Sequence, residues 1–531
     1  MEKTDGGLHM ISHSIFNDVL GPVMAGPSSS HSAGCARIGK MTRGLWGREI
    51  KKAVVVYDSQ GSYPSTCVGQ GSNFGFTGGL LGFPNDEPRM KDSIRIAKEM
   101  GVEISFAEEK LSARHPNEAR IDVYGESGEV ELSVLTLSVG GGMFQIVEMD
   151  GFPVYMDGSR EQLYVCGDAE YAEAIEKKLK EAANCVTRME RDEAADGSIL
   201  FCADEFFGRD VAETAKELVI MPGVRYVRKA EVVLPIEMKK ENQAVFSTAA
   251  KALEYAKECG SSMWELAIDY ECSIGKASRE EVWAQAEHTL DVMKRAATPP
   301  DPETTERFGF LPYQCTNMTE QKKTVKTVNT GYLDKAMFYA VAVMENSCAH
   351  NIVTASPTAG SSGVVPAAVL AVGEEMGCTR EEIVKGLLAA GLAGAFIANQ
   401  ATFGAEVAGC QAENGAASAM AAAGVVELLG GTADQGMKAA SLALQNMLGL
   451  VCDPVGGLTE IPCISRNVAA MSNAVMSANM VMLGFDPVIP YDETILCMYE
   501  VGKMLPSELR CTCEGGLCVT KTGTCIASKL R

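Results

Sequence analysis

The segment Ala416-Ala-Ser-Ala-Met-Ala-Ala-Ala-Gly-Val-Val-Glu-Leu-Leu429 is apolar on almost every face of a helix. A second segment, residues 468–483, has the same character. Helices that are apolar all round are normally buried among other helices. From residue 245 onward the sequence is rich in alanine, methionine and leucine at helical spacing, and few strand patterns occur. We therefore predict an all-α domain over residues 245–531.

The sequence before residue 245 has two parts that differ in their predicted secondary structure. Residues 1–155 mix short apolar runs with glycine-rich turns, and the run 52–57 predicts a strand, so this part is expected to be an α/β domain. Residues 160–240 alternate strand and helix patterns in the order of a ferredoxin-like module. The predicted elements are strand 162–166, helix 169–179, strand 184–190, strand 198–203, helix 210–219 and strand 224–229. The expected fold class is multidomain α+β.

The charge, hydrophobicity and cysteine content of the chain indicate which classes of partner and which compartment to expect. The 531 residues include 47 basic and 69 acidic side chains, a net charge of −22, which disfavours nucleic acid and anionic membranes. The start of the chain lacks the apolar core of a signal peptide, and the most apolar stretch, residues 384–398, is shorter than a membrane span. Eighteen cysteines in so long a chain do not form the dense pattern of secreted disulfide scaffolds. We expect a cytoplasmic protein with reduced thiols and a small-molecule partner.

Three of these cysteines lie in segments marked by glycine or proline. Cys410 occurs in Ala-Gly-Cys-Gln-Ala-Glu, Cys452 in Val-Cys-Asp-Pro-Val-Gly-Gly, and Cys463 in Ile-Pro-Cys-Ile-Ser-Arg-Asn. Turns at these positions would let the thiols leave the helix packing and bind a cofactor. An iron-sulfur cluster usually takes four cysteines, so three would leave one iron open to a substrate. Buried structural thiols are the alternative, because free cysteine is among the most buried residue types.

Two hydroxyl-rich turns offer donors for an anionic group. One is Gly26-Pro-Ser-Ser-Ser-His-Ser-Ala-Gly34, and the other is Thr354-Ala-Ser-Pro-Thr-Ala-Gly-Ser-Ser-Gly363, which is expected to open a helix. Both patterns also suit helix N-caps. His115 and Asn117 stand two residues apart, so on an extended segment they would face the same side, where the histidine could act as a general acid or base. A surface-loop histidine is the alternative.

Taken together, these motifs resemble the iron-sulfur-dependent L-serine dehydratases, also called L-serine ammonia-lyases, in a single-chain form. The longest motif, Cys452-Asp-Pro-Val-Gly-Gly-Leu-Thr-Glu-Ile-Pro-Cys-Ile-Ser-Arg-Asn467, is the most specific. The resemblance implies that residues 1–155 form the family's β part, similar to an allosteric substrate-binding domain. It also implies an ACT-type module in the middle and the catalytic α part over residues 245–531.

The same resemblance assigns site residues. It implies a [4Fe-4S] cluster held by Cys410, Cys452 and Cys463, and an active-site pair of His115 and Asn117. The substrate-binding residues that it implies are Ser28, Ser29, Ser30, His31, Gln70, Thr354, Ser356, Thr358 and Gly360. Gln70 stands where the family usually has a histidine, and Asn73 stands where it has an aspartate. A tail cysteine is a possible fourth ligand, with Cys525 as the first candidate and Cys511, Cys513 and Cys518 as others.

The implied reaction is the conversion of L-serine to pyruvate and ammonia. Hydroxide is a poor leaving group and the Cα proton is weakly acidic, so the reaction needs an electrophile at the oxygen and a base at Cα. We expect a homodimer with an amino-acid substrate and no nucleic-acid or membrane partner. Gln70 leaves a related lyase acting on L-cysteine or L-threonine as an alternative, and a non-catalytic iron-sulfur amino-acid sensor as another.

Overall fold

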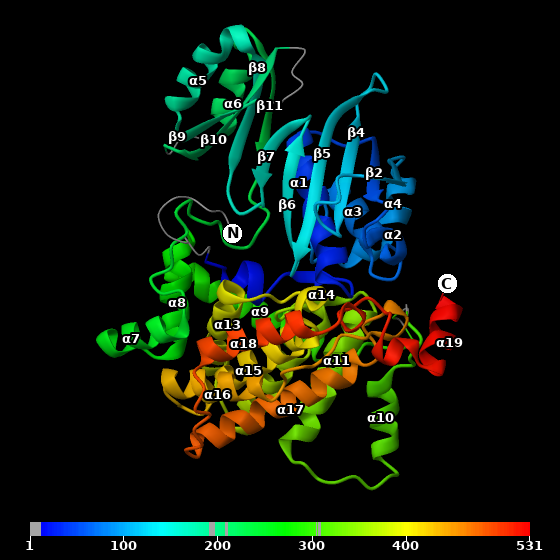
Figure 1. Ribbon diagram of the computed structural model, residues 1–531, viewed down its shortest axis with the longest axis vertical. Coiled ribbons are helices and arrows are strands. Elements are labelled where there is room, and N and C mark those ends of the chain that lie inside the picture. Colours follow the sequence, from blue (N-terminus) through cyan, green and yellow to red (C-terminus); the bar gives the residue numbers. More distant parts are fainter. Residues whose placement is uncertain (1–11, 191–196, 208–210, 304, 306–308, 531) are drawn as a thin grey trace. The chain divides into compact units, whose positions relative to one another are not determined.

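The computed structural model describes residues 12–190, 197–207, 211–303, 305 and 309–530 (Figure 1). The chain forms two compact units. The α/β unit comprises Ser30–Lys240, and the helical unit comprises Met1–Ser29 together with Glu241–Arg531. The structure is thus a mixed α/β protein with an N-terminal sheet region and a helical C-terminal region. Among the described helices, none is both long and apolar enough to cross a membrane.

The α/β unit contains a six-stranded sheet in the order β3-β2-β4-β5-β6-β7. Only the β2–β3 pair is parallel. Helix α1 (Gly34–Trp46) packs on β5 and β6 and against α3 (Ser72–Leu81). A Cβ atom at Gly79 of α3 would lie 2.2 Å from the carbonyl oxygen of Ala36, so glycine permits this close helix contact. The strands are β2 (Lys52–Asp58), β3 (Glu103–Glu109), β4 (Glu118–Tyr124), β5 (Val130–Gly140), β6 (Met143–Met149) and β7 (Phe152–Met156).

A second sheet of the α/β unit has four antiparallel strands in the order β11-β8-β10-β9. Alternate residues of the strands, such as Leu163 and Phe201, pack against Ile175 and Leu218 of the two helices. The predicted strand-helix-strand-strand-helix-strand order is confirmed. The elements are β8 (Gln162–Asp168), α5 (Ala172–Lys180), β9 (Ala183–Met189), β10 (Ser198–Phe206), α6 (Val211–Val219) and β11 (Val224–Ala230).

The helical unit is built around α15 (Asn414–Leu428), which contacts α12, α13, α16 and α17. Figure 1 labels α13, α15, α16 and α17 in this unit. The predicted helix at residues 416–429 is therefore confirmed, and its alanines are buried on every side. Small residues let the helices approach closely, since a Cβ atom at Gly424 would lie 2.7 Å from the carbonyl oxygen of Gly386. The other main helices are α7 (Ala249–Cys259), α8 (Met263–Ile274), α9 (Arg279–Ala296), α10 (Gln314–Lys322), α11 (Tyr332–Cys348), α12 (Val364–Glu375), α13 (Arg380–Gln400), α14 (Ala405–Ala408), α16 (Ala433–Gln445), α17 (Cys463–Met482), α18 (Tyr491–Met504) and α19 (Lys521–Leu530).

One short strand lies inside the region predicted to be all-helical. Strand β12 (Ile352–Thr354) pairs antiparallel with β1 (Val23–Ala25), so that Val23 is opposite Thr354. Three residues are too few to show a period-2 pattern, which explains why this strand is not evident in the sequence. The pairing fixes the position of Thr354 at the start of the second hydroxyl-rich turn.

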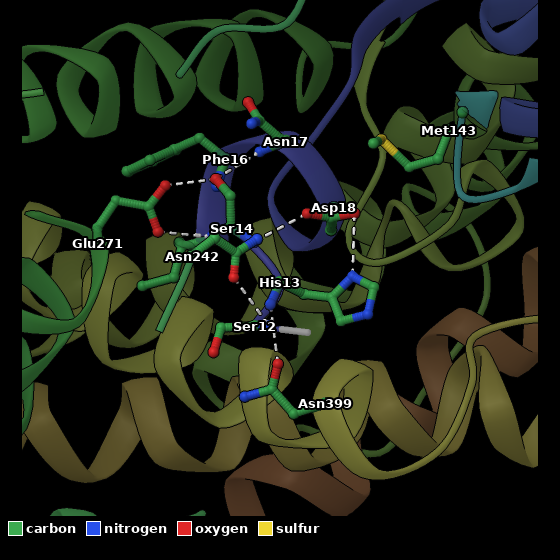
Figure 2. Close-up of polar contacts among 12 residues, drawn as sticks. Ser12, His13, Ser14, Phe16, Asn17, Asp18, Met143, Asn242, Glu271 and Asn399 are labelled. Carbon is green, nitrogen blue, oxygen red and sulfur yellow. Dashed lines mark hydrogen bonds and ion pairs between the residues drawn. The ribbon is translucent and has the colours of Figure 1, made fainter. Parts of the chain in front are cut away.

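Residues 12–19 are held in the helical unit by a buried carboxylate (Figure 2). Glu271 on α8 is fully buried and accepts hydrogen bonds from the Ser14 hydroxyl and from the Ile15 N–H, at 2.8 Å. Asp18 accepts from the Ser14 N–H at 2.8 Å and lies 3.2 Å from Nδ1 of His13. Burial raises the pKa of Glu271 to about 7. Glu271 thus attaches the N-terminal segment together with Asn242 and Asn399, whose side-chain oxygens accept from the N–H groups of Ser12 and His13.

Replacement of Glu271 by glutamine should flatten the pH dependence of stability. The folded pKa lies above the unfolded value, so the stabilising effect of the protonated carboxyl is complete below about pH 4.5 and is lost as the pH rises through about 7. The loss amounts to roughly 3 kcal/mol. Glutamine cannot ionise, so the melting temperature of Glu271→Gln should gain on the wild type between pH 5 and pH 8. Glu258→Gln on the exposed side of α7 is the control, and equal pH slopes for all three proteins would contradict the prediction.

Candidate active site

The three cysteines of the specific motifs are all buried in the helical unit. Cys410 begins a 3₁₀ turn before α15, and Cys452 forms an isolated bridge with Arg510. Cys463 was predicted in a turn, but it is the first residue of α17, with Pro462 at the N-cap position. Proline fits there because it fixes the backbone at the start of a helix. The three thiols therefore come from three segments that are far apart in the sequence.

Burial makes these thiols difficult to ionise without a nearby positive charge. Desolvation raises the pKa of Cys410 to about 12 and that of Cys463 well above its ordinary value. The pKa of Cys452 is also raised well above the ordinary value, first by a hydrogen bond with the thiol of Cys511 and then by burial. Arg466 supplies one positive charge, which acts on Cys410 and Cys463. A metal cofactor would supply more, since a coordinating thiol is deprotonated outright.

The surroundings of the thiols fit a bound cationic group. The Asn414 amide donates to Sγ of Cys410 at 3.0 Å, while Asn414 Oδ1 is buried with no hydrogen-bond partner among the described residues. Arg466 donates to the carbonyl oxygen of Val451 and forms an ion pair with Asp453, both at 2.8 Å. Within the described part of the chain, no three His, Cys, Asp or Glu side chains are placed to hold a single metal ion. A four-iron cluster differs because each thiolate binds a separate iron.

The second hydroxyl-rich turn is hydrogen-bonded to Glu413, three residues after Cys410. Thr354, Ser356 and Thr358 are buried, and Thr358 Oγ1 donates to Oε1 of Glu413 at 2.8 Å. Burial raises the pKa of Glu413 to about 7. The hydroxyl oxygen of Thr354 is buried and makes no hydrogen bond within the described residues. A buried polar atom of this kind is suited to receive a ligand group.

Asn467 on α17 joins this turn to the helix that begins at Cys463. Its side-chain amide donates to the carbonyl oxygens of Gly360 and Cys463, both at 2.8 Å. Its side-chain oxygen accepts from the Gly363 N–H at 2.9 Å. Because Asn467 is completely buried and uses both ends of the amide, it sets the distance between the hydroxyl-rich turn and Cys463.

Replacement of Asn467 by aspartate should destabilise the helical unit. The substitution keeps the shape of the side chain but places acceptor oxygens against the carbonyl oxygens of Gly360 and Cys463, and it buries a charge. We expect a loss of about 3–5 kcal/mol, measured as a fall in the chemical-denaturation midpoint. Asn317→Asp on the exposed face of α10 is the matched control. A midpoint equal to that of the control would contradict the proposed joining contact.

In the α/β unit, a chain of hydrogen bonds links several residues named by the sequence motifs. Buried His31 lies between Oγ of Ser30, 3.0 Å from its Nδ1, and Oγ of Ser62, 3.3 Å from its Nε2. Ser62 donates to the side-chain oxygen of Asn117, whose amide donates to the carbonyl oxygen of Ser138 at 3.3 Å. Burial lowers the pKa of His31 to about 4, so this imidazole is neutral at pH 7.

His115 and Asn117 lie close together, but not in the predicted geometry. The extended segment is wrong, because both residues are in a turn that precedes β4. The turn brings the backbone N–H of Asn117 to within 3.0 Å of Nδ1 of His115, with the N–H as donor. Pro116 between them favours such a turn. The His115 ring is therefore held by the backbone N–H of Asn117, whereas the Asn117 side chain bonds Ser62 and Ser138.

The remaining predicted substrate residues have different positions. Ser28 and Ser29 end the N-terminal segment of the helical unit, whereas Ser30 begins the α/β unit. Gln70 lies in the α/β unit, where its carbonyl oxygen accepts from the Ser32 hydroxyl at 2.8 Å. In the tail of the chain, Cys511 is the cysteine in contact with Cys452. Cys525 is exposed on α19.

Comparison with known proteins identifies the family. The family model of the serine dehydratase alpha chain matches residues 231–518, which include all three buried cysteines. The chain belongs to the serine dehydratase alpha chain family. A relative in this family, the probable L-serine dehydratase alpha chain of Bacillus subtilis, is 37% identical over 286 residues, covering 54% of this chain and 95% of the relative.

Relatives named as separate alpha and beta chains of L-serine dehydratase both match this chain. The L-serine dehydratase alpha chain of Peptoniphilus asaccharolyticus is 36% identical over 281 residues, which are 52% of this chain and 96% of the relative. The probable L-serine dehydratase beta chain of Bacillus subtilis is 42% identical over 148 residues, 28% of this chain and 66% of the relative. This member of the family therefore carries similarity to both an alpha and a beta chain in one polypeptide.

Sequence reasoning missed several residues of the site in this serine dehydratase family member. Glu413 and Asn467 stand inside the quoted motifs, and Asn414 directly follows one of them. None has a function assigned from the sequence, although each is a polar residue within four positions of a cysteine. The sequence around Ser62 and Ser138 gives less indication that these residues belong to the site. Ser62 lies in a hydroxyl-rich turn, whereas nothing in the sequence sets Ser138 apart at the end of β5.

Proposed function

We propose that this chain is an L-serine ammonia-lyase that converts L-serine to pyruvate and ammonia. The observation that supports this proposal best is the connection between two of the three buried thiols, Cys410 and Cys463, and the hydroxyl-rich turn. Asn467 joins the turn to Cys463, and the Thr358–Glu413 hydrogen bond joins it to the segment that begins at Cys410. Groups that could bind a metal cofactor and groups that could bind an amino acid are thus fixed together in the helical unit.

Cys410, Cys452 and Cys463 would hold a [4Fe-4S] cluster in this proposal. When bound, such a cluster supplies a Lewis acid that assists departure of the serine hydroxyl. The chain's own contribution is to keep water and competing donors away, since all three cysteines are buried. Arg466 favours the ionised form of the thiols, because it is a half-buried cation that acts on Cys410 and Cys463.

The hydroxyl-rich turn would orient the amino acid. Thr358 donates its only hydroxyl proton to Glu413, so its oxygen is left as an acceptor for the substrate ammonium group. Thr354 Oγ1 can donate to the substrate carboxylate, since it makes no hydrogen bond within the described residues. The turn would thus present an acceptor for the ammonium group and a donor for the carboxylate, which together recognise an amino acid.

The hydrogen bond at His115 determines which proton it can move. Because the Asn117 N–H donates to Nδ1, a neutral His115 carries its proton on Nε2. In this tautomer, Nε2 can donate a proton to a leaving hydroxide, but it cannot accept one from Cα. We therefore propose that His115 acts as a general acid, with Asn117 holding the tautomer.

The same proposal includes the types of the two sheet domains, the cellular compartment and the oligomeric state. The strand order β11-β8-β10-β9 supports an ACT-type regulatory module in residues 160–240, and the six-stranded sheet supports a domain similar to allosteric substrate-binding domains. All eighteen cysteines are free thiols, which suits the reducing cytoplasm. We also propose a homodimer, which light scattering of the purified chain would test.

A substrate panel with anaerobically purified protein tests the proposed function. We expect iron and sulfide to copurify, and pyruvate and ammonia to form from L-serine faster than oxo acids form from L-threonine or L-cysteine. Faster turnover of L-cysteine or L-threonine would favour the related lyases instead. Binding of L-serine without any product would contradict an enzymatic function and favour a sensor.

A further inference from the structure

The tail, residues 505–530, is attached to the segment that follows Cys452. We call residues 452–457 the ligand loop. The Cys452 N–H donates to the Leu509 carbonyl oxygen at 2.8 Å, and the Cys511 N–H donates back to the Cys452 carbonyl oxygen at 2.9 Å. The Leu517 N–H donates to Oδ2 of Asp453 at 2.8 Å. A conformational change in the tail would therefore alter the backbone hydrogen bonds of Cys452.

Two tail thiols share one carbonyl oxygen of the ligand loop. Sγ of Cys518 donates to the Pro454 carbonyl oxygen at 3.0 Å, and Sγ of Cys513 donates to the same oxygen at 3.5 Å. The two thiols are also hydrogen-bond partners of each other. Cys518 is buried and Cys513 is exposed, so one member of the pair is open to small molecules in solution.

The backbone brings Cys513 and Cys518 together, but Cys513 adopts an unfavourable backbone conformation. Cys513 has a φ of 60°, in the left-handed region that residues with a side chain rarely adopt. Gly516 has a φ of 61°, and together these residues turn the chain so that positions 513 and 518 meet. Glycine would adopt the conformation of Cys513 more easily. Cys511 has a similar φ of 64°, and non-glycine residues in this region are concentrated at functional sites.

We propose that peroxide oxidises the thiols of Cys513 and Cys518 to a disulfide, and that this disulfide weakens the contact between the tail and the ligand loop. In the first step, the sulfur of Cys513 attacks a peroxide oxygen, the O–O bond breaks, and a sulfenic acid and one water form. In the second step, the sulfur of Cys518 attacks the Cys513 sulfur, the S–O bond breaks, and a second water leaves. The two thiols lose two electrons and two protons, and the peroxide takes up both.

Oxidation would change the contact with the ligand loop. A disulfide has no S–H group, so both thiol donors to the Pro454 carbonyl oxygen disappear in one reaction. The Pro454 carbonyl oxygen would keep its hydrogen bond from the Gly457 N–H, at 3.0 Å, but it would lose the two contacts that attach it to the tail. Burial raises the pKa of the Cys513 thiol, so we expect oxidation to be slow compared with that of low-pKa sensor cysteines.

Peptide mapping of the full chain tests the pair directly. Anaerobically purified protein is treated with hydrogen peroxide, free thiols are alkylated, and the protein is digested with trypsin. Cleavage after Arg510 and Lys521 gives a peptide of residues 511–521. We expect this peptide to lose two hydrogens and to keep one alkylated cysteine, Cys511. Cleavage after Glu514 should then give two fragments that stay linked until they are reduced.

Other results of the mapping would overturn the pair. A link from Cys511 to Cys452 or to Cys518, or a fully alkylated peptide under conditions that oxidise exposed Cys525, would do so. Cys513→Ser should abolish the link, and Cys525→Ser should retain it. Cys513 and Cys518 are not among the three cysteines, Cys410, Cys452 and Cys463, that are proposed to hold the cluster, so the mapping gives its answer whether or not the chain dehydrates serine.

Iron release tests the connection to the ligand loop. Serine at position 513 keeps a hydroxyl donor for Pro454 but cannot form the disulfide, so it separates the disulfide from direct damage by peroxide. After the same peroxide treatment, the wild type should release iron to a chelator roughly fivefold faster than Cys513→Ser, the factor that corresponds to the net loss of one ordinary hydrogen bond from the ligand loop. Cys525→Ser should behave as the wild type. Equal rates for wild type and Cys513→Ser would overturn the connection.

Discussion

Replacement of Cys452 by serine is expected to remove the iron and abolish the lyase activity. Serine is nearly the same size, and the backbone hydrogen bonds of residue 452 with Leu509 and Cys511 do not need the sulfur. The hydroxyl is a much poorer ligand for iron than a thiolate. Because loss of a group that merely supports a ligand costs 10–100-fold, loss of a ligand should lower activity at least roughly 100-fold. Iron and sulfide analysis with visible absorption measures the effect on the cluster.

Cys497→Ser is the matched control for this experiment, since Cys497 is an exposed thiol of α18. It should keep the iron content and activity of the wild type. Far-ultraviolet circular dichroism of Cys452→Ser should match that of the control, which would show that iron is lost from a folded protein. Unchanged iron content and absorption in Cys452→Ser would refute the assignment of Cys452 as a ligand.

Replacement of His115 by alanine should separate turnover from cofactor binding. If His115 donates a proton from Nε2, its removal should lower kcat by a factor of about 10²–10⁴. The iron content should not change, because His115 belongs to the α/β unit and the three cysteines belong to the helical unit. Steady-state kinetics with L-serine and iron analysis of the same preparation provide both measurements.

His288→Ala is the control, because His288 is exposed on α9. A general acid is needed only when the leaving group is basic. A serine analogue with a good leaving group at Cβ should therefore lose less activity than serine itself in His115→Ala. Equal losses for the two substrates would show that His115 has another function, and an unchanged kcat would exclude it from the reaction.

Local sequence patterns predicted the elements whose signal is contained within one segment. The helix at residues 416–429 was recognisable because buried alanines surround it, and strand β2 because its apolar run is bounded by turns. Strand β12 was not recognisable, because it is only three residues long and depends on Val23–Ala25 for pairing. The turn at His115 was mistaken for a strand because its deciding hydrogen bond, from the Asn117 N–H, leaves no periodic pattern.

The same distinction applies to the candidate site. Glycine and proline marked the segments of Cys410 and Cys452, and motif resemblance supplied a possible ligand set. Asn467 and Glu413 could not be assigned functions, because their partners come from the turn at residues 354–363, some 50 to 110 positions earlier. The sequence names polar residues near the cysteines, but only the fold shows which of them meet.

The Glu271 contact and the β1–β12 pair have a consequence for the order of folding. Residues 12–29 complete a unit whose other residues begin at Glu241, so this unit is discontinuous in the chain. During synthesis, residues 30–240 emerge as an uninterrupted stretch and can fold first, whereas the N-terminal segment must wait for helices made much later. A fragment beginning at Glu241 would expose the Ile352–Thr354 edge and leave Glu271 without its partners. A synthetic peptide of residues 12–29 should therefore raise the yield of that fragment when the two are refolded together.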